Sequence, residues 1–239
     1  MLLKGRGRLD IQEWYDKLDC HESWLLRGYV TRLYECARTS PGPILEIGAW
    51  LGRSLAILAL GAREAGQYVV AVDPWHVWPN AEPPFEAGGA VLPEYPSVCQ
   101  AMPMCFSLLE KHGLREYVIP IVHTTEHAAP ILRRMKWGFI HIDGDHSRDS
   151  VRYDLSQTAP NLLPGGHIIF HDSGYKAWPR DKVPHPGVDE GIDDWVRDGA
   201  DGCIEVEPVN AEVPHRVFMR PHPTPGGGFF SRLGIRDSG

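Results

Sequence analysis

The stretch LEIGAWLGRS, residues 45–54, decides the fold that this sequence predicts. A short apolar run at 44–47 is followed at once by two glycines, Gly48 and Gly52, and then by helical spacing over 54–64. In open α/β sheets, ligands bind where a strand ends and the chain turns into a helix. Glycines in such a turn let the backbone approach a ligand closely. The stretch therefore predicts a ligand-binding turn, the alternative being a tight turn with two packing glycines.

The alternation of strand and helix continues along the chain. Apolar runs predict strands at 44–47, 68–72, 117–122, 139–142 and 167–170, and a closing hairpin from 204–208 and 216–220. Helical spacing predicts helices at 98–112 (with a kink at Pro103), 125–135, 147–160 and 188–198, and two more within 10–38. Apolar strands between helices are typical of a parallel sheet covered on both faces. We expect a doubly wound, mostly parallel α/β sheet of seven strands.

One domain accounts for the whole chain, residues 1–239, because no internal repeat and no second core is apparent. The expected parts are N-terminal helices over 1–39, a Rossmann-like core over 40–220 and a tail over 221–239. Residues 74–105 are rich in Pro, Gly and aromatic side chains and are expected to form a lid.

Composition restricts the partners. The chain carries 24 Lys and Arg against 31 Asp and Glu, a net charge of −7, which disfavours nucleic acid and an anionic membrane surface. The five cysteines include no CxxC pair, and the N-terminus has no apolar core of signal-peptide length, so we expect a cytoplasmic protein. A small-molecule substrate is the expected partner, and a homo-oligomer stays open.

Acidic residues near the glycine turn favour a cationic nucleoside ligand. Glu46 precedes the glycines, and the spacing is not the GxGxxG of pyrophosphate binders. Asp73 ends the second strand, 25 residues after Gly48, at the distance from which an acidic residue binds ribose hydroxyls. Trp75 is then placed to cover the adenine. The alternative for Asp73 is an ordinary turn residue at a strand end.

A second group of polar residues follows two later strands. HIDGDH, residues 141–146, and His171-Asp172 end neighbouring strands at the same edge of the sheet. Asp143, His171 and Asp172 are expected to converge on one divalent cation, with Asp145 close by. Carboxylates and water suit Mg²⁺ or Mn²⁺, whereas the imidazole shifts the preference toward Mn²⁺, Fe²⁺ or Zn²⁺. The alternative is that these residues cap the helices that follow.

Four segments together resemble the class I S-adenosylmethionine-dependent methyltransferases. They are ILEIGAWLGRS, VAVDPW, VIPIVHTTEHAAPIL and FIHIDGDHSRDSVRYDLSQTAPNLLPGGHIIFHD, and the resemblance covers roughly residues 40–200. More narrowly, they resemble the metal-dependent O-methyltransferases of small molecules, which include catechol O-methyltransferases and sugar O-methyltransferases of antibiotic pathways. The order of strands expected above is that of the methyltransferase variant of the Rossmann sheet.

This resemblance implies S-adenosylmethionine as the cofactor. It places Glu46 and Gly48 at the methionine part, with Gly52 and Ser54 in the same turn. It places Asp73 at the ribose, and Thr125 and His127 near the adenine. Members of the family carry aspartate where His171 stands, which puts the identity of the metal in question.

His146 is the predicted general base. In catechol-type relatives a lysine three residues after the first metal aspartate has this role, and His146 stands three residues after Asp143. Histidine is suited to proton transfer near neutral pH. The predicted catalytic residues are therefore His146 and Asp143, the alternative being that His146 caps the helix from Ser147.

Two other functions compete with methyl transfer. HIDGDH also resembles the HxHxDH signature of metallo-β-lactamase-fold hydrolases, although Asp143 stands where that signature needs a histidine. A nucleotide-binding protein without catalysis is the other alternative, and the filled acidic and histidine positions argue against it. For a methyltransferase, the resemblance favours an acceptor hydroxyl on a sugar or another secondary metabolite.

Overall fold

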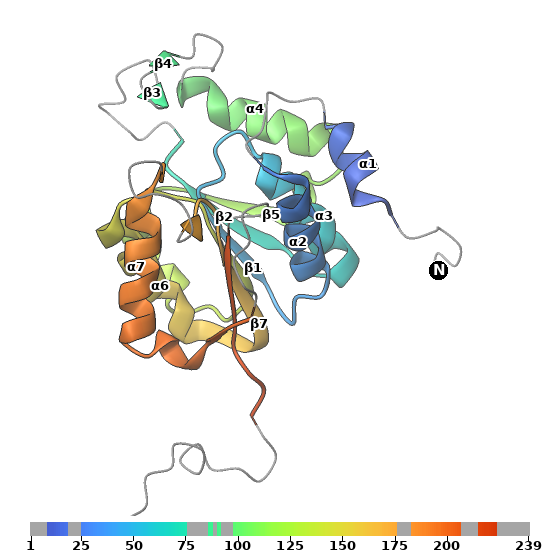
Figure 1. Ribbon diagram of the computed structural model, residues 1–239. Helices are drawn as coiled ribbons and strands as arrows, with labels where there is room; N and C mark the ends of the chain where they lie inside the picture. Colours follow the sequence, from blue (N-terminus) through green and yellow to red (C-terminus); the bar gives the residue numbers. More distant parts are fainter. Residues whose placement is uncertain are drawn as a thin grey trace, which may run out of the picture.

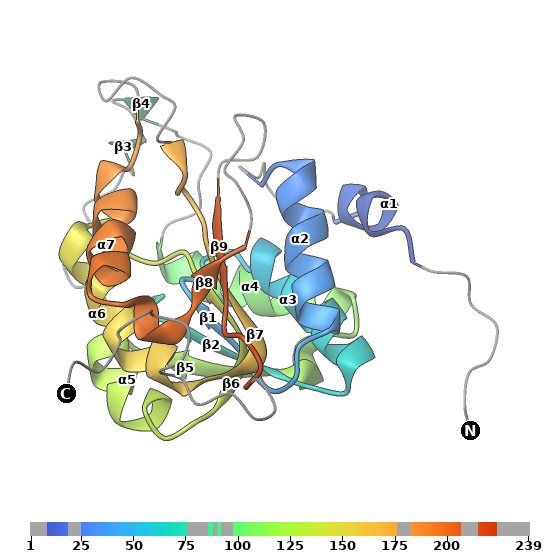
Figure 2. The same cartoon turned by 60° about the horizontal axis from the view of Figure 1, so that its bottom comes forward.

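The computed structural model describes residues 9–18, 25–75, 86–87, 90–91, 98–175, 183–206 and 215–223. Its centre is one seven-stranded sheet in the order β5-β2-β1-β6-β7-β9-β8. The strands are β1 (Ile44–Ile47), β2 (Val69–Asp73), β5 (Val118–Val122), β6 (Trp137–Ile142), β7 (Leu162–Phe170), β8 (Ile204–Glu205) and β9 (Arg216–Met219). The first five strands in the order are parallel, and β9 runs antiparallel to β7 and β8 at the edge shown in Figure 2. The predicted fold class is confirmed.

Helices cover both faces of the sheet, as Figure 1 shows. One face carries α1 (Ile11–Asp16), α2 (Arg27–Arg38), α3 (Arg53–Ala65) and α4 (Val98–Lys111). The other carries α5 (Thr125–Leu132), α6 (Arg148–Thr158) and α7 (Pro186–Arg197). Each set of helices has its own buried apolar cluster against the strands, so the sheet separates two cores. Among the helices described, none has both the length and the apolar character that crossing a bilayer requires.

The alternation of side chains along the strands assigns residues to these two cores. On β1, Ile44 packs into the cluster under α2 and α3, and Leu45 packs into the cluster on the opposite face. On β6, Phe139 and Ile140 divide in the same way. Strands β1 and β6 are in register, with Ile44 opposite Phe139. Glu46 and His141, two residues further along these strands, therefore point to the face that α2 covers.

Three differences from the predicted elements concern β7, α4 and the lid. Strand β7 begins at Leu162, five residues before the predicted start, because Leu162 already pairs with Trp137 of β6. Helix α4 runs through Pro103 as one element. The predicted lid contains a two-stranded sheet, β3 (Glu86–Ala87) with β4 (Ala90–Val91), and the start of α4.

Some predicted features lie outside the described residues. These are most of the lid at 76–85, 88–89 and 92–97, the break at 19–24 between the first two helices, the hairpin turn at 207–214 and the tail from 224 onward.

Helix α6 carries a buried carboxyl on its inner side. Asp154 is 4% exposed, and its carboxylate accepts a hydrogen bond from the hydroxyl of Thr125 on α5. Burial raises the pKa of Asp154 from 3.8 to about 7, because the charged form loses its hydration. The folded protein therefore binds a proton here that the unfolded chain releases near pH 4.

The raised pKa of Asp154 allows the packing between α5 and α6 to be tested. Because the folded-state pKa is raised, wild-type stability should fall as the pH rises from about 4 to about 7 and stay low above that. Asp154→Asn keeps an oxygen acceptor for Thr125 and removes the charge, so its thermal midpoint at pH 8 should exceed that of the wild type by several degrees. The difference should vanish near pH 4. Asp149→Asn, an exposed site on the same helix, is the control. Equal pH profiles for wild type and Asp154→Asn would contradict the burial of a charge.

Candidate active site

Hydrogen bonds between the ends of four parallel strands assemble the site. The amide of Gly48 donates to the carbonyl of Val72, that of Asp143 to Ile47, and that of His171 to Ile142, at 2.9, 2.8 and 3.0 Å. The pairing thus continues one residue beyond the carboxyl ends of β1, β6 and β7. It brings the predicted cofactor turn and the predicted metal residues side by side at one edge of the sheet.

The turn after β1 depends on glycine at position 48. Gly48 has a φ of +85°, and a Cβ there would lie 2.0 Å from the backbone oxygen of Asp143. Any side chain would therefore push apart the two strand ends that form the site. Gly52 is the N-cap of α3, and its amide closes the turn on the carbonyl of Ala49.

Asp73 ties this turn to the end of β2. One carboxylate oxygen accepts hydrogen bonds from the amides of Ala49 and Trp50, both at 2.8 Å, and the other accepts from the amide of Trp75 at 2.7 Å. Asp73 is buried, and burial raises its pKa although the three amides oppose that shift. The residue predicted to bind ribose thus also holds the backbone of the cofactor turn, a role that the sequence did not indicate.

The position of Trp75 corrects the prediction that it covers the adenine. Its side chain is only 2% exposed, its ring packs edge-on against Phe106, and its indole nitrogen donates to the carbonyl of Trp50. The ring is part of the apolar core on the face that α2 and α3 cover, and residue 75 has a left-handed backbone with a φ of +38°. Trp50 is the exposed tryptophan of the turn, at 41%.

Glu46 and Ser54 lie beneath the cofactor turn. The Glu46 side chain is fully buried, and one oxygen lies 3.1 Å from Nδ1 of His141, its register neighbour on β6. Nε2 of His141 in turn lies 2.7 Å from the hydroxyl of Tyr29 on α2. Burial raises the pKa of Glu46, which His141 and Ser54 counteract. The predicted contact of Glu46 with the methionine part of a cofactor stays a prediction.

Polar side chains also follow β5, where the adenine contacts were predicted. Thr125 is buried in the first turn of α5 and is anchored by Asp154. The hydroxyl of Thr124 lies 3.0 Å from Nδ1 of His127, and the rings of His123 and His127 stack at 4.2 Å. The structure thus places Thr125 and His127 at the carboxyl end of a strand, as the sequence predicts.

The predicted metal residues come together. Nδ1 of His171 lies 3.1 Å from a carboxylate oxygen of Asp143 and 3.3 Å from one of Asp172. The three ligand atoms lie within 4.8 Å of one another, a spacing that one cation can bridge. Asp172 adopts a left-handed backbone with a φ of +49°, a strained conformation of the kind that clusters at functional sites.

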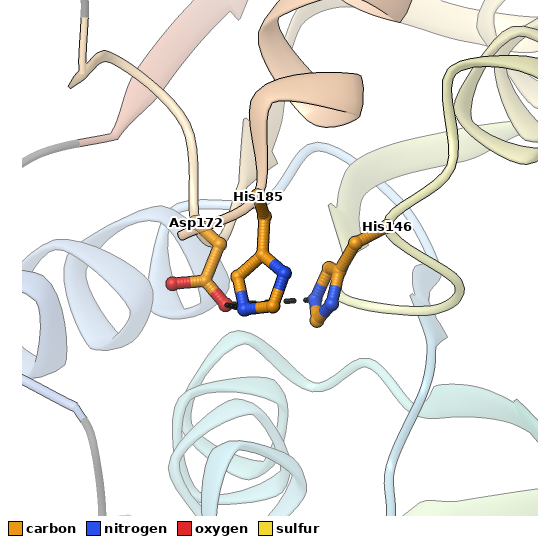
Figure 3. Close-up of side chains that lie close together, drawn as sticks. All are labelled: His146, Asp172 and His185. Atoms are coloured by element: carbon orange, nitrogen blue, oxygen red, sulfur yellow. Dashed lines mark ion pairs between the residues drawn. The ribbon is translucent and has the colours of Figure 1, made fainter. Parts of the chain in front are cut away.

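A fourth and a fifth side chain extend this cluster, as Figure 3 shows. Nε2 of His146 lies 3.6 Å from Asp143 and 3.5 Å from Asp172, and Nε2 of His185 lies 3.8 Å from Asp172. The two imidazole rings lie 4.1 Å apart. Helix α7 delivers His185 here because Gly187 fits against the backbone of His146, where a Cβ would come within 2.6 Å of the carbonyl oxygen.

His185 was missed from the sequence. The only signal was a histidine directly before the Pro-Gly that starts a helix, and this pattern does not say that the helix returns to the site.

Strong electrostatic coupling marks the cluster. Burial alone would raise the pKa of Asp143, but His171 and His146 outweigh it and hold that pKa well below its usual range. Burial alone would lower the pKa of His171, but Asp143 and Asp172 raise it to about 10. The imidazolium of His171, within 3.3 Å of both carboxylates, therefore offsets the repulsion between Asp143 and Asp172.

The donor set fits a divalent cation. Asp143, His171 and Asp172 offer two oxygens and one nitrogen, which suit a first-row transition metal as well as Mg²⁺. Nε2 of His146 is buried and has no hydrogen-bond partner among the residues described, although it faces both carboxylates. This nitrogen faces two carboxylates without a hydrogen bond to either. Such an arrangement suits a site that holds a cation or a proton in transfer.

The structure excludes one of the two roles considered for His146, that of the helix cap. Helix α6 is capped by Ser147, whose hydroxyl accepts from the amide of Ser150, and Asp145 accepts from the amide of Ser147. His146 is therefore not the helix cap, and its ring is free to face the cluster. Asp145 is occupied by this turn and does not join the metal residues in the structure.

Comparison with known proteins identifies the family. A family model described as a methyltransferase domain matches residues 45–173, more than half of the chain. Among solved structures, S-adenosylhomocysteine-bound PaMTH1 from Podospora anserina is 16% identical with a TM-score of 0.61, covering 92% of this chain and 91% of that one.

Two further solved structures are O-methyltransferases. TomG from Streptomyces achromogenes, in complex with S-adenosylmethionine, is 16% identical with a TM-score of 0.57. The match covers 89% of this chain and 86% of TomG. The enzyme from Bacillus cereus, in complex with S-adenosylhomocysteine, is 14% identical with a TM-score of 0.56 and covers 87% of each chain. At these identities the likeness shows the fold, and the family rests on the matched domain. The chain belongs to the methyltransferase domain family and is a class I S-adenosylmethionine-dependent methyltransferase.

Proposed function

We propose that this protein transfers the methyl group of S-adenosylmethionine to a hydroxyl group of a small molecule, assisted by a divalent metal. The observation that carries the proposal is the cluster of Asp143, His146, His171 and Asp172 next to the cofactor turn. The backbone of Asp143 touches Gly48, so a cofactor in the turn and an acceptor at the cluster would be neighbours. Neither a metallo-hydrolase nor a nucleotide-binding protein without catalysis accounts for a cluster next to the cofactor turn of a methyltransferase fold.

Asp143, His171 and Asp172 would hold the metal. A bound divalent ion lowers the pKa of a hydroxyl group that it coordinates and so makes it a better nucleophile. The protein's own contribution is orientation, because methyl transfer is an in-line displacement that requires the acceptor oxygen and the methyl carbon to be aligned. The strand ends that hold Gly48 and Asp143 in contact fix the relative position of these two parts.

His146 would take the proton of the acceptor hydroxyl on Nε2. This atom is buried, lacks a hydrogen-bond partner among the described residues and faces the two carboxylates. A proton placed there would be stabilised by Asp143 and Asp172. Asp143 thus has two tasks, as a metal ligand and as the group that orients His146.

The proposed acceptor is a small secondary metabolite, with a sugar hydroxyl as the first choice. The family resemblance supports this class, and TomG, one of the proteins with the same fold, is described as taking part in tomaymycin synthesis. The net charge of −7 does not favour a nucleic-acid acceptor.

The first prediction concerns the cofactor. Calorimetry should show S-adenosylhomocysteine binding at a micromolar Kd, about −8 kcal/mol. Asp73→Ala should weaken this binding at least tenfold, because it removes the predicted ribose contact and frees three backbone amides of the turn. NAD is the control ligand, and binding of NAD without binding of S-adenosylhomocysteine would refute the assignment.

The second prediction concerns the metal. EDTA should abolish methyl transfer, and Mn²⁺ or Mg²⁺ should restore it. Asp143→Asn and Asp172→Asn should each lose Mn²⁺ binding in calorimetry while keeping their affinity for S-adenosylhomocysteine, because asparagine keeps the size of the side chain and leaves the backbone contact between Asp143 and Gly48 in place. Asp149→Asn, exposed on α6, should behave as the wild type. Full activity in EDTA would remove the metal from the mechanism.

The third prediction concerns His146. If it is the general base, His146→Ala should lower the rate of the chemical step by about 10²- to 10⁴-fold, with the Kd values for cofactor and Mn²⁺ nearly unchanged. Rapid-mixing single-turnover kinetics would measure this rate. His222→Ala, at an exposed position after β9, is the control for loss of an imidazole outside the site. A loss of Mn²⁺ affinity in His146→Ala would instead make His146 a ligand.

A further inference from the structure

Tyr29 is buried between the two halves of the site, although it belongs to neither predicted motif. It lies on α2, outside the residues that match the methyltransferase domain, and its side chain is almost fully buried. Its hydroxyl contacts the strand residues beneath the cofactor turn, and its ring contacts a predicted metal ligand. The same side chain thus touches both parts of the proposed machinery.

The hydroxyl end begins a chain of three buried polar groups. Tyr29 is bonded to Nε2 of His141, and Nδ1 of His141 is bonded to Glu46. A carboxylate can only accept, so Nδ1 carries the proton and Nε2 accepts from the phenol. Each bond therefore specifies the direction of the next.

The ring end packs against imidazoles. The centroid of the Tyr29 ring lies 5.1 Å from that of His171 at 56°, and 5.0 Å from that of His215 at 74°. His171 bridges Asp143 and Asp172 on its other side. The tyrosine ring therefore limits the rotation of the imidazole that the proposed metal site uses.

We propose that Tyr29 is a positioning residue for both halves of the active site. Its hydroxyl fixes the tautomer of His141 and thereby the carboxylate of Glu46 beneath the cofactor turn. Its ring fixes the orientation of His171 toward the carboxylates. The second part rests on the proposed function, since it takes His171 to be a metal ligand, whereas the first part does not.

The physical reason for both effects is burial. His141 and Glu46 have no exposed surface, so water cannot replace a lost partner, and an unpaired buried polar group is costly. Groups that orient a metal-bound histidine typically change metal affinity by about 10- to 100-fold when they are removed. The N-terminal helix is thus part of the site as well as part of the core.

Two variants separate the hydroxyl from the ring. Tyr29→Phe removes the hydroxyl and keeps the ring, and Tyr29→Leu removes both. Tyr34→Phe is the matched control, because Tyr34 is a buried tyrosine on the same helix whose hydroxyl donates to Glu64 instead. Thermal melts define a temperature at which every variant is folded, and all further measurements are made there.

The hydroxyl is tested without any ligand, by long-range ¹H–¹⁵N NMR of histidine-labelled protein at pH 7, with the His141 signals assigned by their loss in His141→Gln. The wild type and Tyr34→Phe should show His141 as the Nδ1–H tautomer. Tyr29→Phe should show a mixture of the Nδ1–H and Nε2–H tautomers. An unchanged Nδ1–H tautomer in Tyr29→Phe would overturn the role of the hydroxyl.

The ring is tested by calorimetric titration of the metal-free protein with Mn²⁺. Tyr29→Leu should raise the Kd by about 10- to 100-fold, and Tyr29→Phe and Tyr34→Phe should stay within about twofold of the wild type. An unchanged Kd in folded Tyr29→Leu would overturn the role of the ring. If the wild type binds no Mn²⁺, the metal part of the proposed function fails and the role of the ring fails with it. The tautomer measurement still decides the role of the hydroxyl.

Discussion

The active site depends on the hydrogen bonds that link the ends of β2, β1, β6 and β7. Each bond runs from the residue just beyond one strand to the last or next-to-last residue of the neighbouring strand, and the three donors are Gly48, Asp143 and His171. Parallel pairing without a register slip between these ends places the three residues in a row. The backbone therefore positions these strand ends, and the side chains proposed as metal ligands and general base project from a frame that is already fixed.

The alternation of side chains along the same strands explains why an outlying helix enters the site. Glu46 and His141 point to the face that α2 covers, because Ile44 and Phe139, two residues earlier on each strand, pack there. A buried carboxyl and a buried imidazole on that face need a polar partner, and Tyr29 supplies one. The polar positions of the strands thus couple the core beneath α2 to the active edge of the sheet.

The sequence predicted the features that follow from local pattern. Apolar runs located the strands, and residues at their carboxyl ends, such as Asp143 and Asp172, could be brought together by the topology of a parallel sheet alone. Tyr29 and His185 could not be found in this way, because they reach the site by packing of α2 and α7 between residues distant in the sequence. Trp75 was misplaced because its ring is buried against Phe106, a contact between residues distant in the sequence that local pattern does not indicate.

The hydrogen bonds of Asp73 have a consequence for cofactor exchange. The carboxylate holds the amides of Ala49 and Trp50, so the protein itself supplies the groups that set the shape of the turn. Ordering a flexible backbone costs about 1–2 kcal/mol for each residue, and a ligand that enters a preorganised turn does not spend its contact energy on that ordering. If the turn binds the cofactor as proposed, spent and fresh cofactor would replace each other there without a step in which the backbone of the turn is ordered anew.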